Sequence, residues 1–190
     1  GFVGLGPVAK VDTERLRRAA AVAQAKAAEV GVAAFALQIG AASLGEVTPE
    51  AAGMAIAEGL ALGAYRYQPP SKERSKEGKA TACQVALHGG NKAAEAAFAN
   101  GLHLGQIAAA ATVFARDLEN HPSNLCTPTA LAKAAQRLAG GRIRCKVLDR
   151  AAMQKLGMGA LLGVAAGSSQ PPKFVVLEYR VPKAKTNVCV

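Results

Sequence analysis

The spacing of apolar positions in the first ninety residues switches between helical and strand periods. Residues 1–6, GFVGLG, are typical of the end of a buried strand that runs into a glycine turn. Apolar residues then recur at helical spacing from Leu16 to Val30, between an N-cap at Asp12 and a C′ glycine at Gly31. Further elements are predicted as a strand at 32–39, a helix from Thr48-Pro49 to about residue 64, and a strand at 81–87. This strand–helix order favours an α/β domain.

The second half begins with a long helical stretch at 91–119, which is one helix or two helices broken near Gly101 or Gly105. The later elements are predicted as a helix from Thr127-Pro128 to Gly140-Gly141, strands at 143–148 and 174–179, and a short helix at 149–156. We therefore expect an α/β domain at 1–92 that is incomplete at its start, a connecting helix at 93–120, and the truncated beginning of a second α/β domain at 121–190. Segment 68–79 is polar and charged and predicts an exposed loop.

The last three residues, Val188-Cys189-Val190, have the character of a strand that has just begun. Because elements are cut at both ends, we expect the sequence to be a piece of a longer polypeptide.

Composition narrows the class of protein. Of 190 residues, 51% are hydrophobic and 19% charged, which is enough to bury a core. No apolar run approaches the roughly 20 residues of a membrane-spanning helix, and residues 1–30 contain no targeting signal. Four separated cysteines form no CxxC pair, so we expect reduced and mostly buried thiols of a cytoplasmic protein, although a targeting peptide that preceded residue 1 would direct the protein to an organelle. They are Cys83, Cys126, Cys145 and Cys189.

Positive charge is concentrated near the carboxyl end. Residues 1–130 contain 12 Lys/Arg and 11 Asp/Glu, whereas residues 131–190 contain 11 Lys/Arg and two acids. In the stretch from Arg142 to Val147, charged and apolar residues alternate, which predicts a strand with one solvated face. A nucleic-acid groove is the less favoured interpretation, because no aromatic residue lies among these cations. An acidic remainder of the same protein is a further interpretation.

Candidate catalytic residues are scattered. Gly1, Gly4 and Gly6 have the spacing G-x-x-G-x-G, not that of a dinucleotide loop, and indicate a strand-end turn. The histidines at 88, 103 and 121 have no partner carboxylate at metal-binding spacing, and the serines at 123, 168 and 169 lie in no nucleophile elbow. Four acids follow residue 106, too scattered for a two-metal site: Asp117, Glu119, Asp149 and Glu178. From the residues alone we assign no catalytic, cofactor-binding or metal-binding residue.

Several blocks match one family in register. Residues 115–128, ARDLENHPSNLCTP, resemble the A-R-D-L-x-N-x-P-x-N-x-x-T-P stretch of the leucyl (cytosol) aminopeptidase family. Residues 147–168, VLD followed by KLGMGALLGVAAGS, and residues 171–179, PPKFVVLEY, are similar to later blocks of that family. Residues 2–6, FVGLG, and 58–67, EGLALGAYRY, resemble its amino-terminal domain.

The resemblance implies an amino-terminal α/β domain joined by a long helix to a catalytic α/β domain. It also implies a cytoplasmic homo-hexamer that removes amino-terminal residues from peptides. Two divalent cations (Zn, Mn or Mg) serve as its cofactors. The family's metal ligands and its catalytic Lys and Arg lie in V-G-K-G-x-x-F-D-x-G-G and N-T-D-A-E-G-R blocks, and neither block occurs here. No functional residue is therefore carried over, and we expect this chain alone to bind no metal.

Within the chain, the resemblance leaves structural roles. We expect residues 116–128 to set the angle between the domains, with two prolines stiffening the loop. We expect Gly157, Gly159 and Gly163 to let backbones approach closely. The alternatives are a catalytically inactive relative that serves as a scaffold, and a member of the family that binds nucleic acid.

Overall fold

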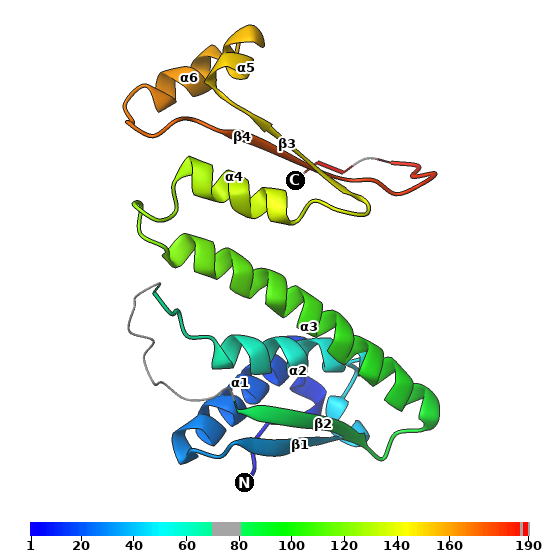
Figure 1. The fold of residues 1–190 in the computed structure, drawn as a ribbon. Helices are drawn as coiled ribbons and strands as arrows, with labels where there is room; N and C mark the ends of the chain where they lie inside the picture. The colour runs from blue at the N-terminus through cyan, green and yellow to red at the C-terminus, as the bar shows by residue number, and fades with distance from the viewer. Residues whose placement is uncertain (70–80, 187, 190) are drawn as a thin grey trace. The chain divides into compact units, whose positions relative to one another are not determined.

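The computed structural model describes residues 1–69, 81–186 and 188–189 (Figure 1). The chain divides into two compact units, Gly1–Asp117 and Leu118–Val190. Both units combine helices with a small sheet, so the predicted α/β class is confirmed. The expected domain bounds 1–92, 93–120 and 121–190 stay a prediction, and most of the loop expected at 68–79 lies outside the described residues.

The first unit has the predicted order of helices and strands. Its elements are η1 (Val8–Lys10), α1 (Thr13–Val30), β1 (Ala34–Gly40), η2 (Ala41–Leu44), α2 (Pro49–Ala64), β2 (Ala82–His88) and α3 (Lys92–Asn120), the last of which continues past the boundary between the units. Local signals begin and end the helices. The Asp12 carboxylate accepts a 2.7 Å hydrogen bond from Arg15 N, and Gly31 ends α1 at φ 78°. The Thr48 hydroxyl accepts from Ala51 N at 3.3 Å, and Pro49 opens α2.

The strand expected at residues 1–6 is wrong. These residues form no strand, and the Phe2 side chain is fully exposed. Gly6 has φ +78° and Pro7 follows it, so the backbone turns away. An apolar run becomes a strand only if a neighbour supplies hydrogen bonds, and among the described residues β1 pairs with β2 alone.

Strands β1 and β2 run parallel, with Ala34 opposite Ala82 and Gly40 opposite His88. Alternate side chains of both strands point to a core built with the helices. The buried members of that core are Val11, Leu16, Ala20, Leu44, Ala52, Ala55, Ile56, Leu87 and Phe98. Leu37, Ile39 and Val85 pack against it from the sheet, while Ala36, Gln38, Gln84 and Ala86 on the other face are exposed. The helices therefore cover one face of the sheet.

Glycines allow the helices of the first unit to pack backbone against backbone. A Cβ on Gly101 of α3 would collide with the Glu50 carbonyl oxygen of α2, and one on Gly105 with that of Met54. A Cβ on Gly63 of α2 would lie 2.8 Å from the Ala21 Cα of α1. Helix α3 therefore runs unbroken past Gly101 and Gly105, because these glycines accommodate a neighbouring helix and do not bend their own.

An ion-pair network also links α1 to α2. Arg17 contacts Glu58 of α2 at 2.7 Å and Glu14 of its own helix at 2.5 Å, and Arg18 lies 2.8 Å from Glu14. Hydrogen bonds from Arg18 and then Arg17 lower the pKa of the Glu14 carboxyl, and the bond to Glu58 raises the pKa of Arg17. The network bridges α1 and α2 beside the backbone contacts of Gly59 and Gly63.

The second unit has a two-stranded sheet and three helices. Its elements are α4 (Pro128–Arg137), β3 (Ile143–Leu148), α5 (Arg150–Lys155), α6 (Gly159–Ala165) and β4 (Phe174–Tyr179). The strands pair antiparallel, with Ile143 opposite Tyr179 and Leu148 opposite Phe174. Both strands and both capped helices were predicted, although α4 ends at Arg137, before Gly140-Gly141. Val188 and Cys189 are not in a strand, and Val190 lies outside the described residues.

The close backbone approach expected at Gly157, Gly159 and Gly163 is wrong. A Cβ on any of the three would have no neighbour within 4 Å among the described residues. Gly157 instead has φ +68°, so it serves the turn between α5 and α6, where a side chain would be strained. Sequence alone does not separate a glycine needed for space from one needed for conformation.

We predict that Gly101→Ala destabilises the first unit by about 2 kcal/mol or more, because the added methyl group forces α2 and α3 apart. Chemical denaturation monitored by circular dichroism measures this. The control is Ala110→Ser, which adds one heavy atom at an exposed position of the same helix and should cost about 0.5 kcal/mol at most. Equal losses in the two variants would contradict the close packing.

We predict that the melting temperature falls more steeply below pH 4.5 in the native chain than in the Glu14→Gln variant. The folded pKa of Glu14 is depressed, so its contribution is complete above the unfolded pKa and is lost as the pH falls through the folded pKa. Glu46→Gln, which removes an exposed acid, is the control and should keep the native slope. Identical slopes in all three proteins would show that the network does not contribute.

Candidate functional site

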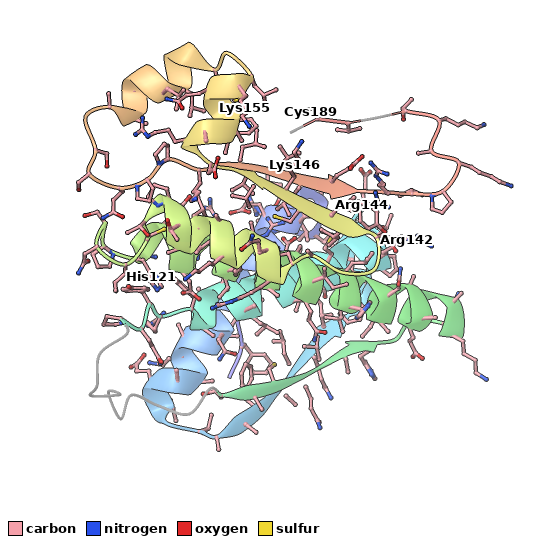
Figure 2. The ribbon with its side chains drawn as sticks, turned by 45° about the horizontal axis from the view of Figure 1, so that its top comes forward. His121, Arg142, Arg144, Lys146, Lys155 and Cys189 are labelled. Carbon is pink, nitrogen blue, oxygen red and sulfur yellow. The ribbon has the colours of Figure 1, made fainter. Side chains whose placement is uncertain are left out.

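The histidines and serines weighed in the sequence differ in exposure. His88 and His103 are exposed, and His121, which Figure 2 labels, is half-buried. The Ser168 hydroxyl accepts from Gln170 N at 3.1 Å, which is a local turn contact. Across residues 1–69, 81–186 and 188–189, no three His, Cys, Asp or Glu side chains converge to hold a metal ion.

Structural contacts occupy three of the four late acids. The Asp149 carboxylate accepts from Ala152 N at 2.9 Å and so caps α5. Glu178 pairs with Arg180 at 2.8 Å, and this bond, aided by the charge of Arg144, lowers the pKa of the Glu178 carboxyl. Asp117 accepts from Tyr65, and Glu119 is exposed.

The cysteines are free thiols, as expected, but they are not mostly buried. Cys83, Cys126 and Cys145 are half-buried, and Cys189 is exposed. Side chains alternate between the two faces of a strand, and Cys83 in β2 and Cys145 in β3 lie on the inner face of their sheets. Because these sheets are small, the two thiols are only partly buried. Partial burial raises the pKa of the Cys83 thiol, which makes it a weaker nucleophile at neutral pH.

The most specific contacts of the family-like blocks lie at the end of α3. The Tyr65 hydroxyl, just after α2, donates to Asp117 Oδ1 at 2.9 Å, across 52 residues of sequence. The Arg116 guanidinium lies 5.6 Å from the centroid of the Tyr65 ring. Two neighbouring residues of α3 thus contact the Tyr65 side chain: Asp117 binds its hydroxyl, and Arg116 lies over the face of its ring. The arrangement fastens the carboxyl end of α2 to α3.

The next residues form a capped turn in the second unit. The Pro122 carbonyl accepts from Leu125 N at 2.8 Å and from Cys126 N at 2.9 Å. The Thr127 hydroxyl then accepts from Ala130 N at 3.2 Å and starts α4. These contacts satisfy backbone groups and order the turn before α4.

A mostly apolar groove of about 790 Å³ lies in the first unit. It lies along α1 and β1 and includes Ala23, Val30 and Phe35. Among its lining residues in the described chain, Lys26 carries the one charge. The lining is otherwise mostly apolar, with Gln38 and Ser43 as its uncharged polar side chains, and we assign the groove no catalytic role.

Comparison with known proteins places both units in one family. Residues 1–69 match the model of the cytosol aminopeptidase family, N-terminal domain, and residues 113–190 match that of its catalytic domain. The chain belongs to the cytosol aminopeptidase family. The resemblance carried by the ARDL, GMGALL and PPKFVVLEY blocks is thereby confirmed.

Curated relatives of this aminopeptidase family chain match almost all of it. A probable cytosol aminopeptidase of Solibacter usitatus is 39% identical over 187 residues, which cover 97% of this chain and 36% of the relative. Another from Streptomyces coelicolor is 38% identical over 204 residues, covering 98% of this chain and 38% of the relative. The chain thus spans little more than a third of the length of these relatives.

Solved structures of the family share the fold. The bottromycin maturation enzyme BotP in complex with Mn superposes with a TM-score of 0.78 at 32% identity, over 95% of this chain and 36% of that protein. A tomato leucine aminopeptidase mutant gives a TM-score of 0.76 at 27% identity, over 96% of this chain and 36% of that one.

Reasoning from the sequence missed two structural features of this chain. The glycines within helices that meet a neighbouring backbone are Gly53, Gly59, Gly63, Gly101 and Gly105. Their spacing of four to six residues within α2 and α3 was the available signal, because glycine is costly inside a helix unless packing requires it. The Tyr65–Asp117 bond left no local signal, since its partners lie far apart in the sequence.

We predict that Tyr65→Phe destabilises the first unit by about 1–2 kcal/mol, because the hydrogen bond from the Tyr65 hydroxyl to Asp117 is lost while the ring stays in place. Thermal denaturation measures the change. Tyr179→Phe removes the same hydroxyl at a site that is 65% exposed and should shift the melting temperature by less than the error. If the two variants melt alike, the Tyr65–Asp117 bond does not contribute to the fold.

Proposed function

We propose that this chain is the architectural part of a two-metal aminopeptidase that removes amino-terminal residues from peptides. The observation that supports this is the order of the two family matches, amino-terminal domain before catalytic domain, at 39% identity over 97% of the chain. In this proposal the chain supplies the first domain, the α3 connection and the entry to the catalytic domain.

The described residues do not fit a metal site. The converging carboxylates that two divalent cations require are absent from them, and three of the four late acids are engaged in a cap, an ion pair and a tyrosine contact. We therefore propose that Zn, Mn or Mg ions bind to residues of the longer polypeptide outside this chain. We derive no catalytic step here.

The chain's own residues have positioning roles in this proposal. Tyr65, Arg116 and Asp117 fasten α2 to the end of α3, and the Pro122 turn orders the entry to α4. We propose that residues 116–128 thereby set the angle between the domains. We propose further that the full protein is a cytoplasmic homo-hexamer that acts on peptide substrates. Among the described helices, none combines the length and the hydropathy of a membrane-spanning segment.

A decisive assay uses the whole reading frame that contains this chain. With Mn²⁺, the full polypeptide should release p-nitroaniline from leucine p-nitroanilide, and EDTA should abolish the reaction, since the metals supply the activated water. The 190-residue chain alone is the control and should show no hydrolysis.

The same assay separates the alternatives. A folded full polypeptide that fails to hydrolyse the substrate with Mn²⁺, Zn²⁺ or Mg²⁺ would contradict the proposal and indicate a catalytically inactive scaffold. Hydrolysis by the isolated chain would contradict our placement of the metal site outside it.

A further inference from the structure

Helix α3 contains a chemically labile pair of residues at the point where it meets α2. Asn100 is followed by Gly101, which is the one Asn-Gly pair in the sequence. In such a pair the glycine backbone nitrogen can attack the asparagine side-chain carbonyl, because glycine has no side chain to hinder the approach. Packing requires this glycine, since a Cβ on Gly101 would collide with the Glu50 carbonyl oxygen of α2, which lies beside α3 (Figure 1). The close contact between the two helices therefore brings a deamidation motif into the fold.

The folded chain keeps the two reacting groups apart. As a residue of α3, Gly101 donates its N–H to the carbonyl four residues earlier, and the helical backbone at Asn100 does not have the geometry of a ring between the two groups. The side chain is held as well, because Asn100 Nδ2 donates to Glu50 Oε1 at 2.5 Å. Phe98, which is 3% exposed, anchors the same turn of α3 in the core. Ring closure therefore requires an opened state in which this turn has left α2.

We propose that Asn100 is a deamidation site that reacts only when α3 opens from α2, and that its product keeps the two helices apart. Hydroxide takes the proton of Gly101 N, this nitrogen bonds to Asn100 Cγ, and the bond from Cγ to Nδ2 breaks. Ammonia leaves with a proton taken from water, which restores the hydroxide, and a succinimide remains. Water then adds to one of the two imide carbonyls and breaks its bond to nitrogen, which gives aspartate or isoaspartate at position 100. Water is the one co-reactant, and nothing is oxidised or reduced.

Both products oppose closing of the helices. Aspartate has no donor in place of Nδ2, so the bond to Glu50 is lost and a second carboxylate lies opposite the first. Isoaspartate adds a methylene group to the main chain directly before Gly101, where the backbone has no spare room against Glu50. Deamidation during openings therefore makes the loss of the native packing irreversible and limits the kinetic stability of the first unit. Both sides of this contact lie within the described chain, so the proposal does not depend on the proposed function.

The test follows aspartate and isoaspartate at position 100 of the full chain by peptide mass spectrometry, at mildly alkaline pH and constant temperature. The chain unfolded in urea gives the unprotected rate, and the native chain should react about tenfold more slowly or slower still. Ile56→Val loosens the core from the α2 side, away from the reacting pair, and should speed the native reaction about two- to tenfold. Ile107→Val makes the same change at a 56% exposed position of α3 and should leave the rate unchanged. In urea all three chains should react alike, and circular dichroism confirms that the variants fold.

A second measurement tests the effect of the product. Asn100→Asp should lower the melting temperature of the full chain by about 2–4 °C, because the donor to Glu50 is lost and a like charge is added. In the Glu50→Gln background the same change should lower it less, since the glutamine amide can donate to the new carboxylate.

Three results would overturn the proposal. The first is the same rate in the native and the unfolded chain, which would mean that the fold does not protect Asn100. The second is the same rate in Ile56→Val and Ile107→Val, including no product from either, which would separate the reaction from opening of the core. The third is an unchanged melting temperature in Asn100→Asp, which would mean that an aspartate at this position does not hold the helices apart.

Discussion

The first unit depends on direct contact between helix backbones. Gly101 and Gly105 of α3 meet carbonyl groups of α2, and Gly59 and Gly63 of α2 meet α1. These contacts leave no room for a methyl group, so the separations of the three helices are set by the backbones themselves. The core is accordingly rich in alanine and holds few large side chains, with Leu16 and Ile56 the largest that are fully buried in this unit. The packed helices in turn position the sheet and the Tyr65–Asp117 bond.

This constraint separates architecture from chemistry within the chain. Polar groups near the helices are used to cap, to pair or to hold a neighbour, as Asp12, Glu58 and Asp117 do. Residues 131–190 hold eleven Lys/Arg and two acids, so the second unit is the more basic of the two. A chain of the cytosol aminopeptidase family that spans about a third of its relatives' length thus carries a rigid first unit and a basic surface in the second.

Local signals predicted most of the elements. The caps at Asp12, Thr48, Thr127 and Asp149 each bond the backbone three residues later, and a cap is visible in the sequence because both partners are neighbours. The predictions that were wrong concern contacts between residues that are distant in the sequence. Residues 1–6 have strand character but find no strand to pair with, and Gly163 looks like a packing glycine but has open space around it. The absence of assigned site residues stays a prediction, and the family blocks, not the composition, indicated the proposed activity.

Native-state hydrogen exchange tests the central role of the helix contacts most directly. If the glycine-mediated packing holds the first unit together, the amides of α3 near Gly101 and Gly105 should exchange together with those of α2, at the slowest rate in the unit. Amides of α6, which has no buried residue, should exchange far faster. Exchange of the α3 amides as fast as those of α6, or before the β1–β2 amides, would contradict the account.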